Sequence, residues 1–185
     1  MADKETALIV GAGQGLSASL ARLFASEGMD VAIAARNTDK LSGLCEETGA
    51  SAYACDAVDA GQVDALFAAV TADIGEPDVV VYNASNRARG PVQDLDPEAV
   101  RTAIEISCFG GFLVAQAAAK QMIARNSGTI LLTGASASVK GYPNSSSFAM
   151  GKFGLRGLAQ SLARELQPQN IHVAHFVIDG GILQG

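Results

Sequence analysis

Short apolar runs alternate with amphipathic segments along the whole chain. The apolar runs predict strands at Thr6–Val10, Asp30–Ala35, Ser51–Cys55, Asp78–Tyr82, Gly128–Thr133 and Ile171–Val177. Helical spacing predicts helices between them at Gln14–Glu27, Thr38–Thr48, Asp59–Gly75, Asp96–Asn126 and Ser145–Leu166. We expect the segment Asp96–Asn126 to form two helices, broken near Ser107. Strands and helices that alternate in this way form parallel pairs with right-handed crossovers.

This order of elements predicts a single α/β domain spanning residues 1–185. The expected fold is a Rossmann-type doubly wound parallel sheet in three αβα layers, with about six strands and the last strand at an edge. Two helix starts carry capping signals, because Asp59 and Gln62 form a capping pair and Asp96 precedes a first-turn proline and an acidic residue.

Charge and composition exclude several classes of function. The chain has 13 basic and 19 acidic residues and a net charge of −6, which argues against a nucleic-acid partner. Its cysteines, Cys45, Cys55 and Cys108, form no Cys-x-x-Cys pair, so we expect no metal site and no disulfide framework. The polar N-terminus and the lack of an apolar run of about 18 residues predict a cytoplasmic protein without membrane contact.

Glycines at 11, 13 and 15 lie between the first strand and the first helix. Free amides and the helix dipole attract a phosphate there, which predicts a nucleotide ligand. The dinucleotide pattern G-x-G-x-x-G would place glycine at 16, where the chain has Leu16, so S-adenosylmethionine is an alternative ligand. The second strand ends without an acid, at Arg36 and Asn37. A guanidinium at this place suits a ribose 2′-phosphate, so the sequence favours NADP(H) over NAD(H).

Several motifs in one order resemble the short-chain dehydrogenase/reductase family. They are the glycine turn with Leu16, Asp56 after the third strand, Asn83-Ala84-Ser85 after the fourth, and Lys152 in the last long helix. The third glycine of the family's turn is replaced by Ser17, and its Pro-Gly after the sixth strand corresponds to Asp179-Gly180. The resemblance and the turn together predict a set of cofactor-binding residues: Gly11, Gly13, Gln14, Gly15, Leu16, Ala35, Arg36, Asn37, Asp56, Ala57, Asn83, Ala84, Ser85, Lys152, Gly180 and Ile182.

The catalytic positions that the resemblance implies are mostly altered. Phe148 stands where the family has its proton-transferring tyrosine, four residues before Lys152, and a phenyl ring has no proton to transfer. The family serine maps to Ala135, with Ser136 one residue away, and the family asparagine maps to Ser107. Tyr142, in the loop before the last helix, is a candidate substitute acid. Lys152 keeps the family's ribose-binding role.

The sequence leaves three functions open. The first is an oxidoreductase that moves hydride between NADP(H) and a small carbonyl or alcohol, and the second is a dinucleotide-binding sensor or scaffold without turnover. A methyltransferase is a third alternative. We interpret His172 and His175, on opposite faces of the sixth strand, as packing or surface residues.

The resemblance also implies an assembly and a further segment. It implies a homodimer or homotetramer paired through helices at about 107–126 and 145–166, whose outer faces are rich in alanine, glycine and leucine. The family adds a seventh strand and a substrate lid after the sixth strand, and we expect both to be absent from this chain, either by truncation or because the chain is a minimal member.

Overall fold

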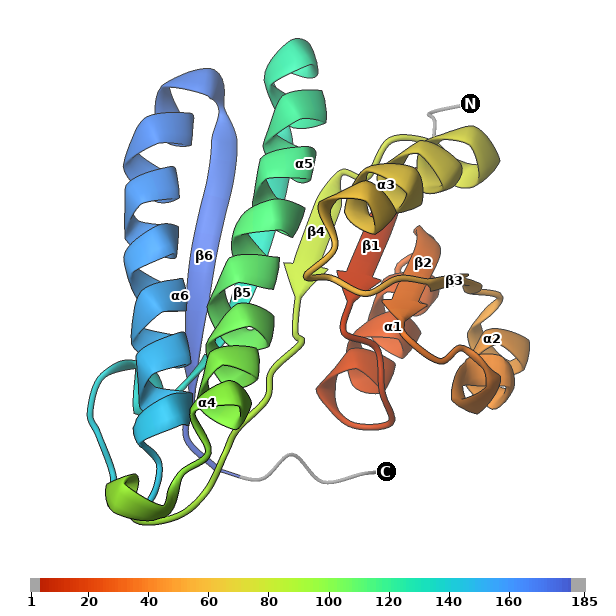
Figure 1. Cartoon of the computed structure of the whole chain (residues 1–185). Helices are drawn as coiled ribbons and strands as arrows, with labels where there is room; N and C mark the ends of the chain where they lie inside the picture. Colours follow the sequence, from red (N-terminus) through yellow and green to blue (C-terminus); the bar gives the residue numbers. More distant parts are fainter. Residues whose placement is uncertain (1–3, 181–185) are drawn as a thin grey trace.

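The computed structural model describes residues 4–180, which form a parallel sheet between two layers of helices (Figure 1). The strand order is β3-β2-β1-β4-β5-β6, and every neighbouring pair is parallel. The strands are β1 (Thr6–Val10), β2 (Asp30–Ala35), β3 (Ser51–Ala54), β4 (Val79–Tyr82), β5 (Gly128–Ala135) and β6 (Ile171–Ile178). The prediction of a doubly wound α/β sheet with six strands is therefore confirmed.

The helices divide between the two faces of the sheet. They are α1 (Leu16–Ser26), α2 (Ser42–Thr48), α3 (Ala60–Ile74), α4 (Pro97–Ile104), α5 (Gly110–Arg125) and α6 (Ser146–Leu166). A core that includes Leu8, Val80 and Ile130 lies under α3, α5 and α6, and a smaller core around Ile9 and Ile33 lies under α1 and α2 (Figure 1). Strands that are buried on both faces read as continuous apolar runs, which explains why the sequence located them well.

Two α-helices are found as predicted, and the interruption near Ser107 is a π-helical turn. A π-helical turn, Glu105–Phe109, joins α4 to α5 and keeps the two helices in one continuous rod (Figure 1). Such turns shift the hydrogen-bond register by one residue and occur often at functional sites. The joined helix is apolar and long enough to cross a membrane, but 56% of its most apolar window is buried inside the protein, as in the core helix of a globular domain.

The capping predictions hold with one difference. The Asp59 carboxylate accepts a hydrogen bond from the Gln62 amide, and Asp96 accepts bonds from Glu98 and Ala99 at the start of α4. The Gln62 side chain does not complete the reciprocal box, because its oxygen accepts from the Asp56 amide instead. This bond ties the end of β3 to α3.

Candidate functional site

The glycine turn packs directly on the end of β4. Gly11 has a φ of +89°, and a Cβ there would lie 2.3 Å from the Ala84 amide nitrogen, so only glycine fits. Ser17, which replaces the family's third glycine, is buried and donates a hydrogen bond to the Gly11 carbonyl (3.1 Å). Its Oγ also accepts one from Asn83 Nδ2 (2.8 Å). The serine therefore joins the turn to the end of β4.

The remaining glycines of the turn face open space at the N-terminus of α1. Gly15 is the residue that precedes the helix, and a Cβ on Gly13 or Gly15 would meet no atom within 4 Å. The helix N-terminus offers backbone amides and a positive dipole, and this open space leaves room for a phosphate beside them. The turn therefore fits the pyrophosphate of a dinucleotide.

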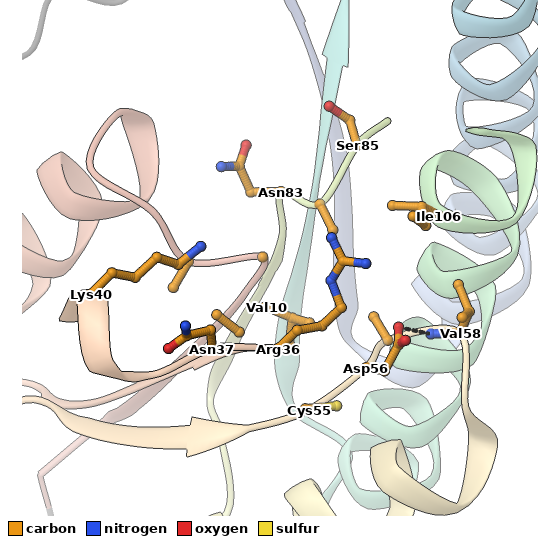
Figure 2. Close-up of a pocket in the computed structure, with 15 residues that line it drawn as sticks. Val10, Arg36, Asn37, Lys40, Cys55, Asp56, Val58, Asn83, Ser85 and Ile106 are labelled. Carbon is orange, nitrogen blue, oxygen red and sulfur yellow. Dashed lines mark hydrogen bonds between the residues drawn. The ribbon is translucent and has the colours of Figure 1, made fainter. Parts of the chain in front are cut away.

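A cavity of about 630 Å³ extends from this turn along the carboxyl edge of the sheet (Figure 2). Its lining includes nine of the predicted cofactor residues: Gly11, Ala35, Arg36, Asn37, Asp56, Ala57, Asn83, Ala84 and Ser85. Gly13 and Gln14 line a smaller adjoining hollow of about 250 Å³. Gly15 lies at the start of α1, and Ile182 is outside the described residues.

Two cations reach the wall of the large cavity from the loop after β2. In Figure 2 the guanidinium of Arg36 extends into the space between Asn83 and Asp56, and the amine of Lys40 points toward the same space from the other side. Sequence reasoning selected Arg36 and missed Lys40. The available signal was a second basic residue in the same loop, four positions after Arg36.

A second cavity, of about 310 Å³, continues from the first toward α6. Asn83 and Ser85 line both cavities, so the two form one cleft along the ends of β1, β2, β4 and β5. The second cavity brings together Leu16, Ser136, Phe148, Lys152 and Gly180. Residues chosen from four separate segments of the sequence therefore meet in one place.

Lys152 is the most buried charged group of this cavity. Its side chain is 3% exposed, and its Nζ donates a hydrogen bond to the Thr133 carbonyl (2.7 Å). Burial, and secondarily the nearby Arg87, lowers the pKa of Lys152 to about 8. The Nζ lies 5.8 Å from the ring centroid of Phe148, so the residue that the resemblance aligns with the family tyrosine lies beside the lysine.

Ser136 and Tyr142 lie close together beside this cavity. Ser136 lines it, whereas Tyr142 is 40% exposed. The neighbouring Ser136 hydroxyl, and then Lys140, lowers the pKa of the Tyr142 phenol. The Lys140 amine lies 5.1 Å from the centroid of the Tyr142 ring. A phenol, a serine and a lysine therefore form a cluster in the loop that precedes α6, and Lys140 was missed from sequence.

Two buried serines hold the loop that follows β4. Ser107, at the position of the family asparagine, accepts a hydrogen bond from the Asn86 amide and donates one to the Asn86 carbonyl, both at 3.1 Å. Ser147 does the same at Ala88, with distances of 3.0 and 2.8 Å. Both serines are fully buried. The residue between the two attachments is Arg87.

Arg87 is the site residue that sequence reasoning missed most clearly. Its Cζ lies 4.3 Å from the centroid of the Phe148 ring, in the cation–π range, and it lines the second cavity. The only signal for it was its place four residues after Asn83. His175, on β6, lies outside this cavity, and its Nε2 is buried without a hydrogen-bond partner among the described residues.

Comparisons with known proteins agree on one family. The family model described as "short chain dehydrogenase" matches residues 5–182. A trans-4-hydroxycyclohexanecarboxylate dehydrogenase from Sinomonas cyclohexanicum is 33% identical over 181 residues, covering 92% of this chain and 70% of that protein.

Solved structures agree as well. A short-chain dehydrogenase from Rhodopseudomonas palustris superposes with a TM-score of 0.90 and 36% identity, over 95% of this chain and 85% of that one. An actinorhodin polyketide ketoreductase crystallised with NADPH gives 0.91 and 28%, over 95% and 70%.

Proposed function

Because the chain belongs to the short-chain dehydrogenase family, we propose that it is an NADP(H)-dependent oxidoreductase acting on a small carbonyl or alcohol. The observation that carries this proposal is the cleft itself. Its large cavity is lined by Arg36, the glycine turn and Asn83, and its second cavity, which shares Asn83 and Ser85 with the first, reaches Lys152. A nicotinamide dinucleotide bound along it would supply the hydride, and the chain's own side chains would fix the cofactor and move the proton.

Arg36 and Lys40 support NADP(H) as the cofactor. Both line the large cavity, and the only acid among its lining residues is Asp56, after β3. A 2′-phosphate carries close to two negative charges at neutral pH, so two cations at the end of β2 favour it and leave no carboxylate to hold the ribose hydroxyls of NAD(H).

Lys152 is assigned to the ribose of the nicotinamide rather than to proton transfer. The family role that lowers a tyrosine pKa has no target here, because Phe148 stands at that position. The buried amine keeps donors beyond the one that bonds Thr133, and these are free to hold ribose hydroxyls.

The proton then requires another donor, and we propose Tyr142. Ser136, which lines the cavity, favours the ionised form of this phenol, as does Lys140, whose amine lies over the ring. In reduction, the hydride reaches the carbonyl carbon while the phenol protonates the oxygen, which leaves an alcohol and a tyrosinate that solvent reprotonates. General acid catalysis of this kind contributes on the order of 10²–10⁴ in rate.

A cofactor-binding protein without turnover is the second candidate, and Phe148, Ala135 and Ser107 favour it. The two are separated by NADPH binding, measured by fluorescence, and NADPH oxidation over a panel of carbonyl compounds, with the wild type, Phe148→Tyr and Tyr142→Phe. The oxidoreductase predicts wild-type turnover that Tyr142→Phe lowers at least tenfold. Tight NADPH binding with turnover only in Phe148→Tyr would favour the second function, and no NADPH binding would contradict both.

We also propose that the protein forms a homodimer or homotetramer through α5 and α6. The expected small-residue faces are only part of the surface there. Large apolar side chains are exposed on the π-helical turn and on these two helices: Phe109, Phe112, Ile123, Met150 and Phe153. Burial of such side chains is the usual driving force of a stable interface.

A further inference from the structure

The cavity beside Phe148 carries unbalanced positive charge. Of the twelve residues that line it, two are basic, Arg87 and Lys152, and none is acidic. Neither side chain takes part in an ion pair within residues 4–180. Burial and the nearby Arg87 lower the pKa of Lys152 to about 8, so the amine still carries its positive charge at pH 7.

The Arg87 side chain is exposed, but the backbone on either side of it is held by hydrogen bonds. Ser107 bonds both backbone groups of Asn86, and Ser147 bonds both backbone groups of Ala88, so the chain is fixed on each side of Arg87. The Arg87 side chain still has rotatable bonds, but its guanidinium packs over the Phe148 ring at 4.3 Å. The ring covers one face of the guanidinium. The N–H donors along the edge of the guanidinium remain available to a ligand.

We propose that Arg87 binds a carboxylate of the substrate, so that the substrate is a short oxo acid or the corresponding hydroxy acid. This inference rests on the proposed oxidoreductase function. The planar fork of arginine matches a carboxylate in two parallel hydrogen bonds. The Phe148 ring beside it offers an apolar wall for a short carbon chain, and the cavity of about 310 Å³ has room for a molecule of this size.

The position of Arg87 also separates its role from that of the cofactor-binding cations. Arg36 and Lys40 line the far end of the cleft, whereas Arg87 does not line the large cavity at all. Phe148 then contributes to the specificity of the site, because its ring supports the guanidinium that binds the carboxylate.

The test compares carboxylates with their neutral amides. Pyruvate, acetoacetate and 4-oxopentanoate, each paired with its carboxamide, are titrated calorimetrically into protein saturated with NADP⁺, in which no reduction can occur. We expect at least one acid to bind about 10- to 100-fold more tightly than its amide, the range for hydrogen bonds to charged groups. No preference for any acid over its amide would overturn the inference.

Substitutions test whether Arg87 is the residue that causes the preference for acids. Arg87→Met keeps an apolar stem over the ring and should remove the acid preference. Arg87→Lys should restore part of that preference. Arg89→Gln is the control, because Arg89 is exposed like Arg87 but lines neither cavity. NADPH affinity should remain within about threefold in all of them. A parallel loss of NADPH affinity in Arg87→Met would make Arg87 a cofactor ligand and contradict the inference.

Turnover is measured separately, so the two proposals can fail independently. A preference for acids without NADPH oxidation would support the carboxylate site at Arg87 and contradict the proposed oxidoreductase function. Reduction of neutral carbonyls without acid preference would support the oxidoreductase and contradict the carboxylate site.

Discussion

Residue 148 limits the chemistry that the second cavity, beside Lys152, can support. A phenyl ring cannot transfer a proton, but its face attracts cations, and Arg87 and Lys152 both lie near it. Phe148 therefore lies beside positive charge at the position where the resemblance places the family's proton donor. The proposed donor, Tyr142, lies on a neighbouring loop with its own lysine.

Lys152 gives cofactor binding a predictable pH dependence. Burial lowers the pKa of Lys152 to about 8 in the free protein, and we expect the protonated amine to be the form that donates to the ribose and attracts the phosphates. NADPH affinity should be constant from pH 7 to about 8 and then fall up to about tenfold per pH unit as the amine loses its proton. Fluorescence titrations of NADPH across this range measure it.

Lys152→Met is the control for this pH dependence. It should bind NADPH more weakly at pH 7 and show a flat profile. The Cys55 thiol also lines the cleft, but burial raises its pKa to about 11, outside the range. A wild-type profile that is flat through pH 9 would contradict the role given to Lys152.

Arg36 should control the choice between the two dinucleotides. Arg36→Asp is expected to weaken NADPH binding about 10- to 100-fold through loss of a charged hydrogen bond and repulsion of the 2′-phosphate, and to leave NADH binding equal or tighter. The ratio of the two dissociation constants is the readout. Arg101→Asp makes the same charge change at an exposed position on α4 and should leave the ratio unchanged.

At the scale of elements, α6 packs tightly on the π-helical turn. A Cβ on Gly151 would lie 2.6 Å from the Ser107 Cβ, and one on Gly154 would lie 2.7 Å from the Cys108 sulfur. This close approach is what lets Ser107 and Ser147 both reach the loop that carries Arg87.

Gly151→Ala should therefore destabilise the protein by about 1–3 kcal/mol, as overpacking does, and disturb the bonds that hold Asn86. Gly157 lies on the same helix with open space around it, so Gly157→Ala should instead be neutral or stabilise by up to about 1 kcal/mol. Urea unfolding of the two variants provides the comparison. Equal effects would show that the contact at Gly151 relaxes freely.

The sequence predicted the helices and strands better than the connections between them. Strands such as β1 and β2 were located within one residue because burial on both faces leaves an apolar run. The π-helical turn was predicted as a break, because a one-residue shift of hydrogen bonding leaves little trace in periodicity. The glycine turn and Arg36 followed from local motifs, whereas Arg87 depends on two serines distant in sequence, and no local pattern encodes such contacts.

At the scale of the whole molecule, the exposed apolar side chains predict association. Phe109 and Phe112 stack on each other at 6.1 Å, and Phe153 is exposed on α6. Phe112→Glu should shift a dimer or tetramer toward monomer in sedimentation equilibrium, because it would bury a charge in the interface. Val92→Glu, at a 77% exposed position outside these helices, should have no effect. A wild type that is monomeric at tens of micromolar would contradict the proposal.

The central claim is that the cleft carries hydride between NADP(H) and a small carbonyl compound. Mass spectrometry of the products formed with NADPH deuterated at C4 tests this claim most directly, over the paired oxo acids and amides. The proposed function predicts an alcohol with deuterium on the carbinol carbon, formed by the wild type and at least tenfold more slowly by Arg36→Asp at limiting NADPH. An NADPH complex that forms tightly and yields no deuterated alcohol from any compound would contradict it.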